Sequence, residues 1–150
     1  MNLLRRPILL QSSRLELRDV IAWLVGNYDL PTDQVIRITL GIHLAAEPAE
    51  PIGFVSYGPL PEDEEKREIA YAIHPEHWGN GHATEAAAVF LQWVRASFGP
   101  GPIYASVDPG NTGSLAVLGK IGFSPVPQEE AFPGGRVLLR DGAGEKEMRR

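Results

Sequence analysis

The residues best suited to chemistry form a short glycine-containing turn, Trp78-Gly79-Asn80-Gly81-His82, between an apolar run and a helical pattern. Glycine lets the backbone approach a ligand because no Cβ stands in the way. The first N–H groups of the following helix have no partner inside it, and the helix dipole places partial positive charge there. Such a turn can hold phosphate or pyrophosphate through main-chain amides alone. The alternative is an ordinary strand-to-helix connection, because a lone Gly-x-Gly is a weak signal.

This turn lies within a series of strand, loop, helix, strand and helix. Residues 69–73 are apolar and residues 103–107 are rich in β-forming side chains, so both predict strands. Apolar residues at spacings of three and four predict a helix over 80–96, and a second helical pattern over 114–120 stops at Gly122. The apolar stripe of the first helix is Ala83, Ala86, Ala87, Phe90, Leu91 and Val94. This order predicts two parallel strands joined by a right-handed crossover.

These residues resemble the GNAT superfamily of acetyl-coenzyme A-dependent N-acyltransferases, in particular its ribosomal-protein alanine N-acetyltransferase subgroup. Residues 68–86 look like that subgroup's strand, coenzyme A loop and helix start. Residues 111–123 look like the family's later motif, in which an Asn opens a helix that ends in Gly-Phe. The two motifs follow in the family's order, whereas the first 50 residues carry little of the resemblance.

Two other nucleotide-binding patterns fit less well. A dinucleotide fold also has a Gly-x-Gly turn and an acidic residue after the next strand, here Asp108. Its third glycine is replaced by Thr84, and the motif lies in mid-chain after segments that read as antiparallel strands. The phosphate-loop NTPase pattern fails because no Gly-Lys-Ser/Thr follows.

The resemblance implies an α/β fold with a mixed, mainly antiparallel sheet of six to seven strands, a splayed parallel central pair and flanking helices. We expect residues 1–150 to form a single domain. The family usually places two helices between its first two strands, where they help to form the acceptor site. Here there is room for about one, which leaves an open site or one that a partner subunit completes in a homodimer.

The resemblance also implies direct transfer of an acetyl group from acetyl-CoA to a primary amine of a small molecule, peptide or protein N-terminus, without a metal. Glu68, at the start of the central strand, is the candidate general base; its alternative is a solvated member of an acidic run. Strict alternation would put Glu68, Ala70 and Ala72 on one face. The family's usual acid, a tyrosine, is replaced by Leu118, so water would protonate the leaving thiolate. This loss keeps a second hypothesis open, a non-catalytic acyl-CoA binding or sensing module.

The residues expected to bind the cofactor gather at the turn and at the start of the second helix. They are Ile73, His74, Trp78, Gly79, Asn80, Gly81, His82, Ala83, Thr84, Asn111 and Ser114. Most family members have Gln or Arg at the position of Trp78, which we expect to pack against the loop. Asn111 either contacts the pantetheine arm or is an ordinary helix cap. The spacing of the four histidines predicts no metal site.

The N-terminal segments are less clear. Residues 7–11 predict a strand. A Ser-x-x-Glu capping box and apolar spacing predict a helix over 13–26, although 14–18 also resembles the subgroup's first strand. Alternation over 34–45 and 51–57 predicts an antiparallel hairpin.

Two further segments flank the motifs. The charge-rich stretch 59–67 predicts a solvated loop. After Phe123 we expect a weak strand, then a strand over 136–140 that ends the sheet as an antiparallel edge, and a loose tail over 141–150.

Composition narrows the function classes. With 43% hydrophobic and 22% charged residues, the chain has an ordinary globular composition. It has no cysteine, which excludes disulfides, thiolate nucleophiles and Cys-ligated zinc. The net charge of -5 argues against a nucleic-acid partner and mildly favours a cationic partner such as an amine. No apolar run predicts a membrane span or a secretion signal, so we expect a cytoplasmic protein.

Overall fold

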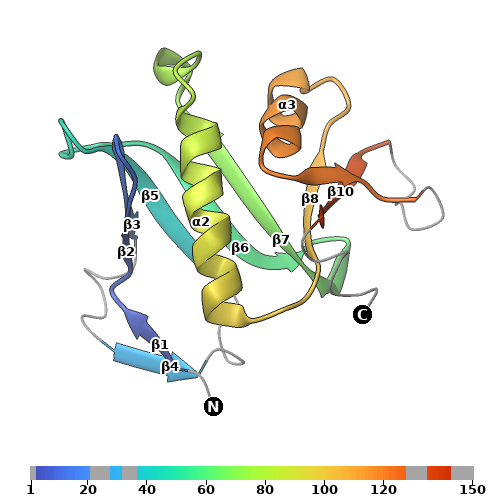
Figure 1. Cartoon of the computed structure of the whole chain (residues 1–150), viewed down its shortest axis with the longest axis horizontal. Coiled ribbons are helices and arrows are strands. Elements are labelled where there is room, and N and C mark those ends of the chain that lie inside the picture. Colours follow the sequence, from blue (N-terminus) through green and yellow to red (C-terminus); the bar gives the residue numbers. More distant parts are fainter. Residues whose placement is uncertain (1–2, 21–27, 32–36, 128–134, 143–150) are drawn as a thin grey trace. The chain divides into compact units, whose positions relative to one another are not determined.

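The computed structural model describes residues 3–20, 28–31, 37–127 and 135–142 (Figure 1). The chain divides into two compact units. The first consists of Met1–Tyr57 and Ala70–Gly99, and the second of Gly58–Ile69 and Pro100–Arg150. Strands β6 and β7 each contribute to both units, which are described separately below.

The fold is α/β, as the resemblance implied, with a mixed and mainly antiparallel sheet. Its strands follow the hydrogen-bonded order β2-β3-β5-β6-β7-β8-β10-β9, so within the described residues the sheet has 8 strands where six to seven were expected. A separate pair consists of β1 and β4. The strands are β1 (Leu3–Arg6), β2 (Leu9–Gln11), β3 (Leu15–Asp19), β4 (Tyr28–Pro31), β5 (Ile38–Leu44), β6 (Pro51–Leu60), β7 (Asp63–Ile73), β8 (Ile103–Val107), β9 (Phe123–Pro125) and β10 (Val137–Asp141). The helices are the short 3-10 helix η2 (Pro75–His77), α2 (His82–Phe98) and α3 (Thr112–Lys120).

In the first unit, α2 lies along one face of strands β5 and β6 (Figure 1). The predicted helix over 80–96 is confirmed, with a shift of two residues toward the C-terminus. Its apolar stripe is buried apart from Ala83, and it packs over the alternate buried residues of β3 and β5. These fully buried strand residues are Leu15, Leu17, Ile38, Leu40 and Ile42. The predicted hairpin is also confirmed, because β5 and β6 pair in antiparallel fashion.

The helix predicted over residues 13–26 is wrong where the structure describes it. Residues 15–19 form β3, which pairs with both β2 and β5. Leu15 and Leu17 are fully buried while Glu16 and Arg18 lie on the other face, so the alternation of a strand prevails over the helical spacing. Residues 21–26 of that prediction lie outside the described residues, as does most of the shortened acceptor region.

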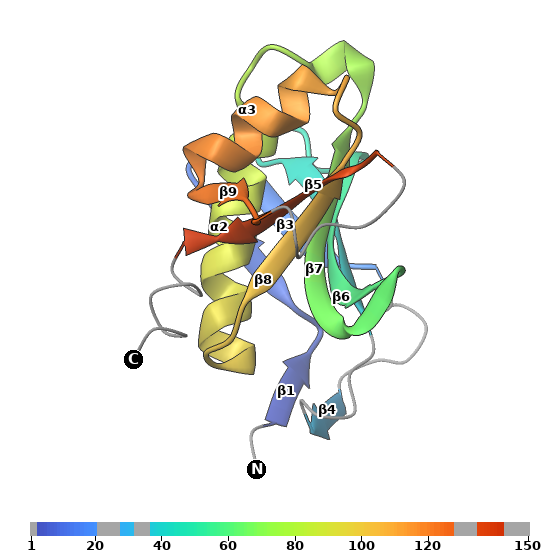
Figure 2. The same cartoon turned by 90° about the vertical axis from the view of Figure 1, so that its right-hand side faces the viewer.

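In the second unit, the parallel pairing of the two central strands is confirmed. Arg67 of β7 lies opposite Ile103 of β8, and Glu68 lies opposite Tyr104. Helix α3 lies beside β9 (Figure 2). Strand β10 pairs with β8 on one side and β9 on the other, so the prediction that it forms the sheet edge is wrong. The weak strand predicted after Phe123 is confirmed as β9, and it takes the edge position.

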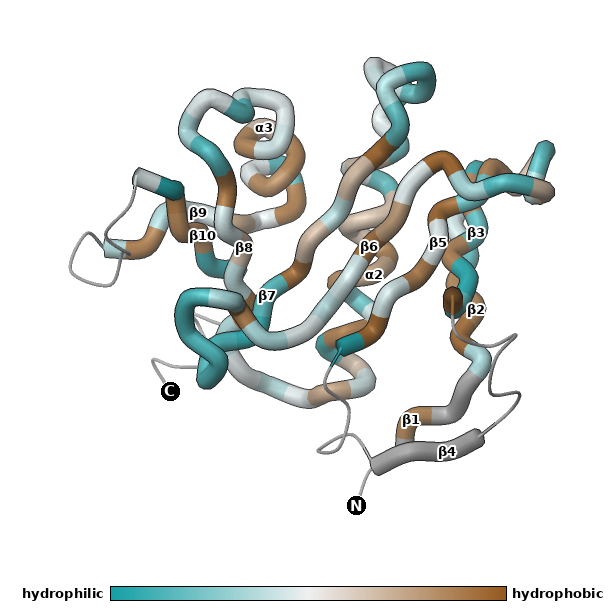
Figure 3. The backbone as a smooth tube through the Cα atoms, turned by 180° about the vertical axis from the view of Figure 1, so that it is seen from behind, coloured by the Kyte–Doolittle hydropathy of each residue, from teal (hydrophilic) through white to brown (hydrophobic). Residues whose placement is uncertain are grey.

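The solvated loop predicted over 59–67 is also wrong. Strand β6 continues to Leu60, a turn occupies residues 61–62, and β7 begins at Asp63. The charged residues thus belong to the end of a hairpin, which is hydrophilic at its tip (Figure 3). A strand with one exposed face accommodates such charges, so a charge run alone does not exclude a strand.

Candidate functional site

The turn between β7 and α2 leaves part of its main-chain donors unused. Helix α2 begins after Gly81 without any side-chain cap. The amides of His77 and Trp78 donate to the carbonyl groups of His74 and Pro75. Within the part of the chain that the structure describes, the N–H groups of residues 79–84 donate to no carbonyl or side chain. This end of α2 therefore presents unpaired donors and the positive end of the helix dipole.

Two glycines of this turn adopt backbone conformations that other residues disfavour. Gly79 has φ 80° and Gly81 has φ 77°, both in the left-handed region. A Cβ at Gly79 would meet no atom within 4 Å, and one at Gly81 would lie 3.5 Å from Nη2 of Arg14. The glycines are therefore required by the backbone conformation and not by a steric clash.

Side chains of the turn bind its own carbonyl groups. Nε1 of Trp78 donates to the carbonyl oxygen of Ile73 at 2.7 Å. Nδ2 of Asn80 lies 3.3 Å from the carbonyl oxygen of His77 and 3.2 Å from that of Trp78. Nδ1 of His74 accepts from the amide of Glu76 at 3.3 Å. The bonds of Trp78 and Asn80 use carbonyl acceptors and the bond of His74 uses the amide of Glu76, so none of them uses the donors of residues 79–84.

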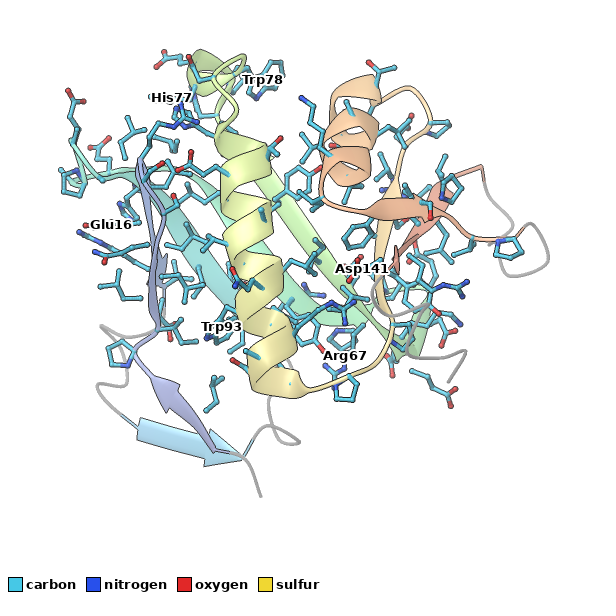
Figure 4. All side chains as sticks on the ribbon, in the orientation of Figure 1. Glu16, Arg67, His77, Trp78, Trp93 and Asp141 are labelled. Atoms are coloured by element: carbon cyan, nitrogen blue, oxygen red, sulfur yellow. The ribbon has the colours of Figure 1, made fainter. Side chains whose placement is uncertain are left out.

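Trp78 lies at the outer end of the loop (Figure 4). Its side chain is 67% exposed, which is unusual for a residue of this size. Trp78 was expected to pack against the loop, and the contact that it makes there is the hydrogen bond from Nε1 to the carbonyl oxygen of Ile73. Most of the indole surface is therefore open to solvent.

A cluster that sequence reasoning missed connects the turn to the β2–β3 connection. The carboxylate of Glu85 accepts hydrogen bonds from the Ser12 hydroxyl, from Nε of Arg14 at 2.8 Å and from the amide of Arg14 at 3.1 Å. Nη2 of Arg14 donates to the carbonyl oxygen of Asn80 at 2.9 Å. Burial alone would raise the pKa of Glu85, but the hydrogen bonds from Ser12 and Arg14 outweigh it and lower that pKa. Glu85 is therefore a charged carboxylate that links Ser12 and Arg14 to the start of α2.

His82 is a buried imidazole in the first turn of α2. It is 8% exposed, and its Nδ1 has no hydrogen-bond partner among the described residues. Burial lowers its pKa, and the positive charge of Arg14 and the nearby His77 lower it further, while Glu85 opposes them. The rings of His77 and His82 lie 6.4 Å apart. A buried polar atom without a hydrogen-bond partner is uncommon in folded proteins.

The predicted residues of the second unit have different surroundings. Glu68 is 9% exposed, so it is buried and not the solvated end of an acidic run. Oδ1 of Asn111 accepts from the amide of Ser114 at 3.1 Å, which is the helix-cap role that the sequence left open. Leu118 is buried within α3.

The structure thus groups most of the predicted cofactor-binding residues in the first unit. Those residues are Ile73, His74, Trp78, Gly79, Asn80, Gly81, His82, Ala83 and Thr84. Glu68, Asn111 and Ser114 belong to the second unit.

Among the described residues, no group of three or more His, Asp or Glu could hold a metal ion. No helical segment of the described chain combines the length and hydrophobicity of a bilayer span.

Comparison with protein families gives one match. A model described as an acetyltransferase (GNAT) domain matches residues 11–124. The chain is 41% identical over 61 residues to the uncharacterized protein YkkB of Bacillus subtilis (strain 168), covering 41% of this chain and 36% of that protein. It is 30% identical over 80 residues to the uncharacterized N-acetyltransferase p20 of Bacillus licheniformis, covering 53% and 45%. The chain therefore spans less than half the length of these relatives.

Solved structures share the fold at low sequence identity. A putative GnaT-family acetyltransferase from Bordetella pertussis superposes with TM-score 0.70 at 22% identity, covering 89% of this chain and 99% of that one. An acetyltransferase from Agrobacterium tumefaciens str. C58 gives TM-score 0.71 at 23% identity, covering 93% and 97%. A ribosomal-protein-S5-alanine acetyltransferase from Vibrio fischeri gives TM-score 0.65 at 14% identity, covering 89% and 96%. At these identities the similarity concerns the fold alone.

Proposed function

Because the chain belongs to the GNAT acetyltransferase family, we propose that it is an N-acetyltransferase that moves an acetyl group from acetyl-CoA to a primary amine. The observation that carries this proposal is the set of unpaired main-chain donors over residues 79–84 at the start of α2. A diphosphate is the part of acetyl-CoA that such donors suit, because each N–H can donate to an anionic oxygen. In the proposed reaction acetyl-CoA is a co-substrate, and no metal takes part.

The turn suits a diphosphate for a second reason. The site needs no lysine, because the helix dipole and the amides supply positive potential. Gly79 and Gly81 expose those amides without a Cβ. We propose that Ile73, His74 and Trp78 border the bound cofactor, and that Asn111 and Ser114 contact it from the start of α3.

The proposed reaction is direct transfer. The amine nitrogen attacks the thioester carbonyl carbon, a C–N bond forms and the C–S bond breaks. The proton leaves the amine for Glu68, directly or through water, and the departing thiolate takes a proton from water because Leu118 offers none. Glu68 is buried and not exposed at the end of an acidic run, which supports this role.

The amine must be deprotonated before it attacks, which limits the acceptor. At pH 7, deprotonation of a lysine-type amine with pKa near 10.4 costs about 4.6 kcal/mol, whereas an α-amine near 7.8 costs about 1 kcal/mol. An N-terminal or other weakly basic amine is therefore the easier acceptor for a site without a strong base. The ribosomal-protein-S5-alanine acetyltransferase among the structural neighbours is named for an acceptor of the protein class.

A turnover assay tests this function. Wild-type protein is incubated with acetyl-CoA and a panel of amines, peptides and proteins, and released thiol and acetylated product are measured. We expect thiol release above background, with a mass increase on at least one acceptor. Binding of CoA without thiol release would support the alternative, an acyl-CoA sensor, which the replacement of the usual tyrosine by Leu118 favours. Thermal stabilisation by NAD or ATP but not by CoA would overturn both.

Several wider features stay predictions. We propose that residues 1–150 act as one acyltransferase domain, that the protein works in the cytoplasm, and that it binds neither nucleic acid nor membrane. A homodimer would complete the acceptor site if the shortened region leaves it open. Light scattering at several concentrations tests the dimer.

A further inference from the structure

We propose that Arg14 is a positioning residue for the diphosphate-binding turn, and that it acts through Asn80 and Glu85. This inference rests on the proposed function, because it assigns a role in binding the same cofactor. Arg14 lies in the connection between β2 and β3, far along the sequence from the turn. The two motifs that indicate the family, residues 68–86 and 111–123, do not include it, although residues 14–18 also resemble the subgroup's first strand.

Arg14 fixes the orientation of one peptide group in the turn. Its Nη2 donates to the carbonyl oxygen of Asn80 at 2.9 Å. In a trans peptide the carbonyl and the following N–H point in opposite directions. The bond to Arg14 therefore turns the N–H of Gly81 away from the guanidinium. Without this bond, the flexible glycine would let the peptide rotate and lose the aligned set of donors.

Arg14 also neutralises a negative charge at the start of α2. A carboxylate in the first turn of the helix would repel an anionic ligand at the same helix end, although it is favourable for the helix itself. Glu85 is such a carboxylate, and it forms an ion pair with Nε of Arg14 at 2.8 Å. The Ser12 hydroxyl also donates to it. The pair neutralises Glu85 and keeps its charge from weakening an anion site.

The contacts of Arg14 are geometrically specific. The guanidinium binds two acceptors, Glu85 and the carbonyl oxygen of Asn80, and the amide of the same residue binds Glu85 as well. Lysine cannot reproduce this arrangement, since its ammonium is a single point charge. Arg14 therefore connects the β2–β3 connection to the turn through hydrogen bonds of fixed geometry.

The neighbouring strand offers a matched control. Arg18 forms an ion pair with Glu16 on β3 at 2.5 Å, and the side chains are 45% and 19% exposed. The side chains of Arg14 and Glu85 are 48% and 19% exposed. Among the described residues, each arginine is thus a similarly exposed partner in an ion pair, and of the two only Arg14 bonds to the turn.

The test compares two acetyl donors. Arg14→Ala, Arg14→Lys and Arg18→Ala are assayed with acetyl-CoA and with S-acetylpantetheine, which lacks the diphosphate. We expect Arg14→Ala to lower kcat/KM for acetyl-CoA about tenfold, through KM, because loss of a charge-assisted hydrogen bond costs about 1.4 kcal/mol or more. With S-acetylpantetheine its kcat/KM should match wild type. Arg14→Lys should recover part of the loss, and Arg18→Ala should leave both donors unchanged.

Three outcomes decide the inference. If Arg14→Ala lowers kcat/KM equally for both donors, or no more than Arg18→Ala does, the positioning role is wrong. If wild-type protein neither binds nor uses acetyl-CoA, the proposed function fails together with it. If Arg14→Ala does not fold, Ser12→Ala and Arg14→Lys must show the same donor-dependent loss in smaller measure, and a loss with both donors overturns the inference.

Discussion

Replacement of Gly81 by alanine should weaken either the fold or the binding of acetyl-CoA, by an amount that the structure allows us to estimate. Gly81 has φ 77° and ψ 9°, a left-handed conformation that costs a non-glycine residue about 1–2 kcal/mol. A Cβ there would lie 3.5 Å from Nη2 of Arg14, an ordinary contact, so no steric term is added. The change in unfolding free energy should therefore be the conformational cost alone.

The same cost sets the effect on affinity. If the variant relaxes to another conformation in the free state, binding loses about 1–2 kcal/mol of free energy, which raises Kd about five- to thirtyfold. If it keeps the left-handed conformation, the melting temperature should fall by about 3–8 °C. Gly81→Asn should recover part of either loss, because Asn tolerates this region better than Ala.

The assay is thermal denaturation combined with calorimetric titration of acetyl-CoA. Gly119→Ala is the control, because Gly119 lies in α3, has an ordinary φ and would meet no atom within 4 Å. That change should stabilise the protein by about 0.5–1 kcal/mol and leave affinity unchanged. Wild-type stability and affinity in Gly81→Ala, or equal losses in the Ala and Asn variants, would refute the reasoning.

Three other groups allow further predictions. Glu68→Gln should lower kcat about 10²- to 10⁴-fold if Glu68 is the base, and steady-state kinetics with a circular-dichroism check on folding would show it. Because the fold lowers the pKa of Glu85, the charged carboxylate contributes its full stabilisation above pH 4.5, and this is lost as the pH falls through the folded-state pKa. Urea unfolding at several pH values below 4.5 should therefore show a smaller slope of unfolding free energy against pH in Glu85→Gln than in wild type. Gly53→Ala should lower the unfolding free energy by about 3 kcal/mol or more, because the new Cβ would collide with the carbonyl of Ala72 and lie 3.0 Å from Cα of Ile73. A melting temperature within about 1 °C of wild type would contradict this.

The central part of the fold could be predicted because local signals agree there. Apolar spacing, glycines and strand propensity all indicate one arrangement over residues 69–123, and the parallel pairing of β7 with β8 is confirmed. The N-terminal helix failed because residues 13–26 satisfy two periods at once. Pairing of β3 with both β2 and β5 decides between those periods, and a single sequence does not show that pairing.

The candidate site could be predicted only in part, for a related reason. Main-chain donors leave a local signal, since glycines and a helix start are visible in the sequence. The cluster of Ser12, Arg14 and Glu85 leaves almost none, because Ser12 and Arg14 lie more than 70 positions from Glu85 and each residue type is common on surfaces. The one hint was Glu85 itself, an acidic residue off the apolar stripe in the first turn of α2.

In a site that binds its ligand through main-chain amides, affinity depends on the residues that fix the backbone conformation more than on the side chains around it. Side chains that point away from a main-chain site can vary without loss, whereas residues that fix the backbone cannot. Gly81 fixes it by its conformation, and Arg14 fixes it by holding the carbonyl oxygen of Asn80. The two act on the same peptide group, because the Asn80 carbonyl and the Gly81 N–H share one plane. Their effects on acetyl-CoA affinity should therefore be less than additive, since loss of either already frees that peptide to rotate.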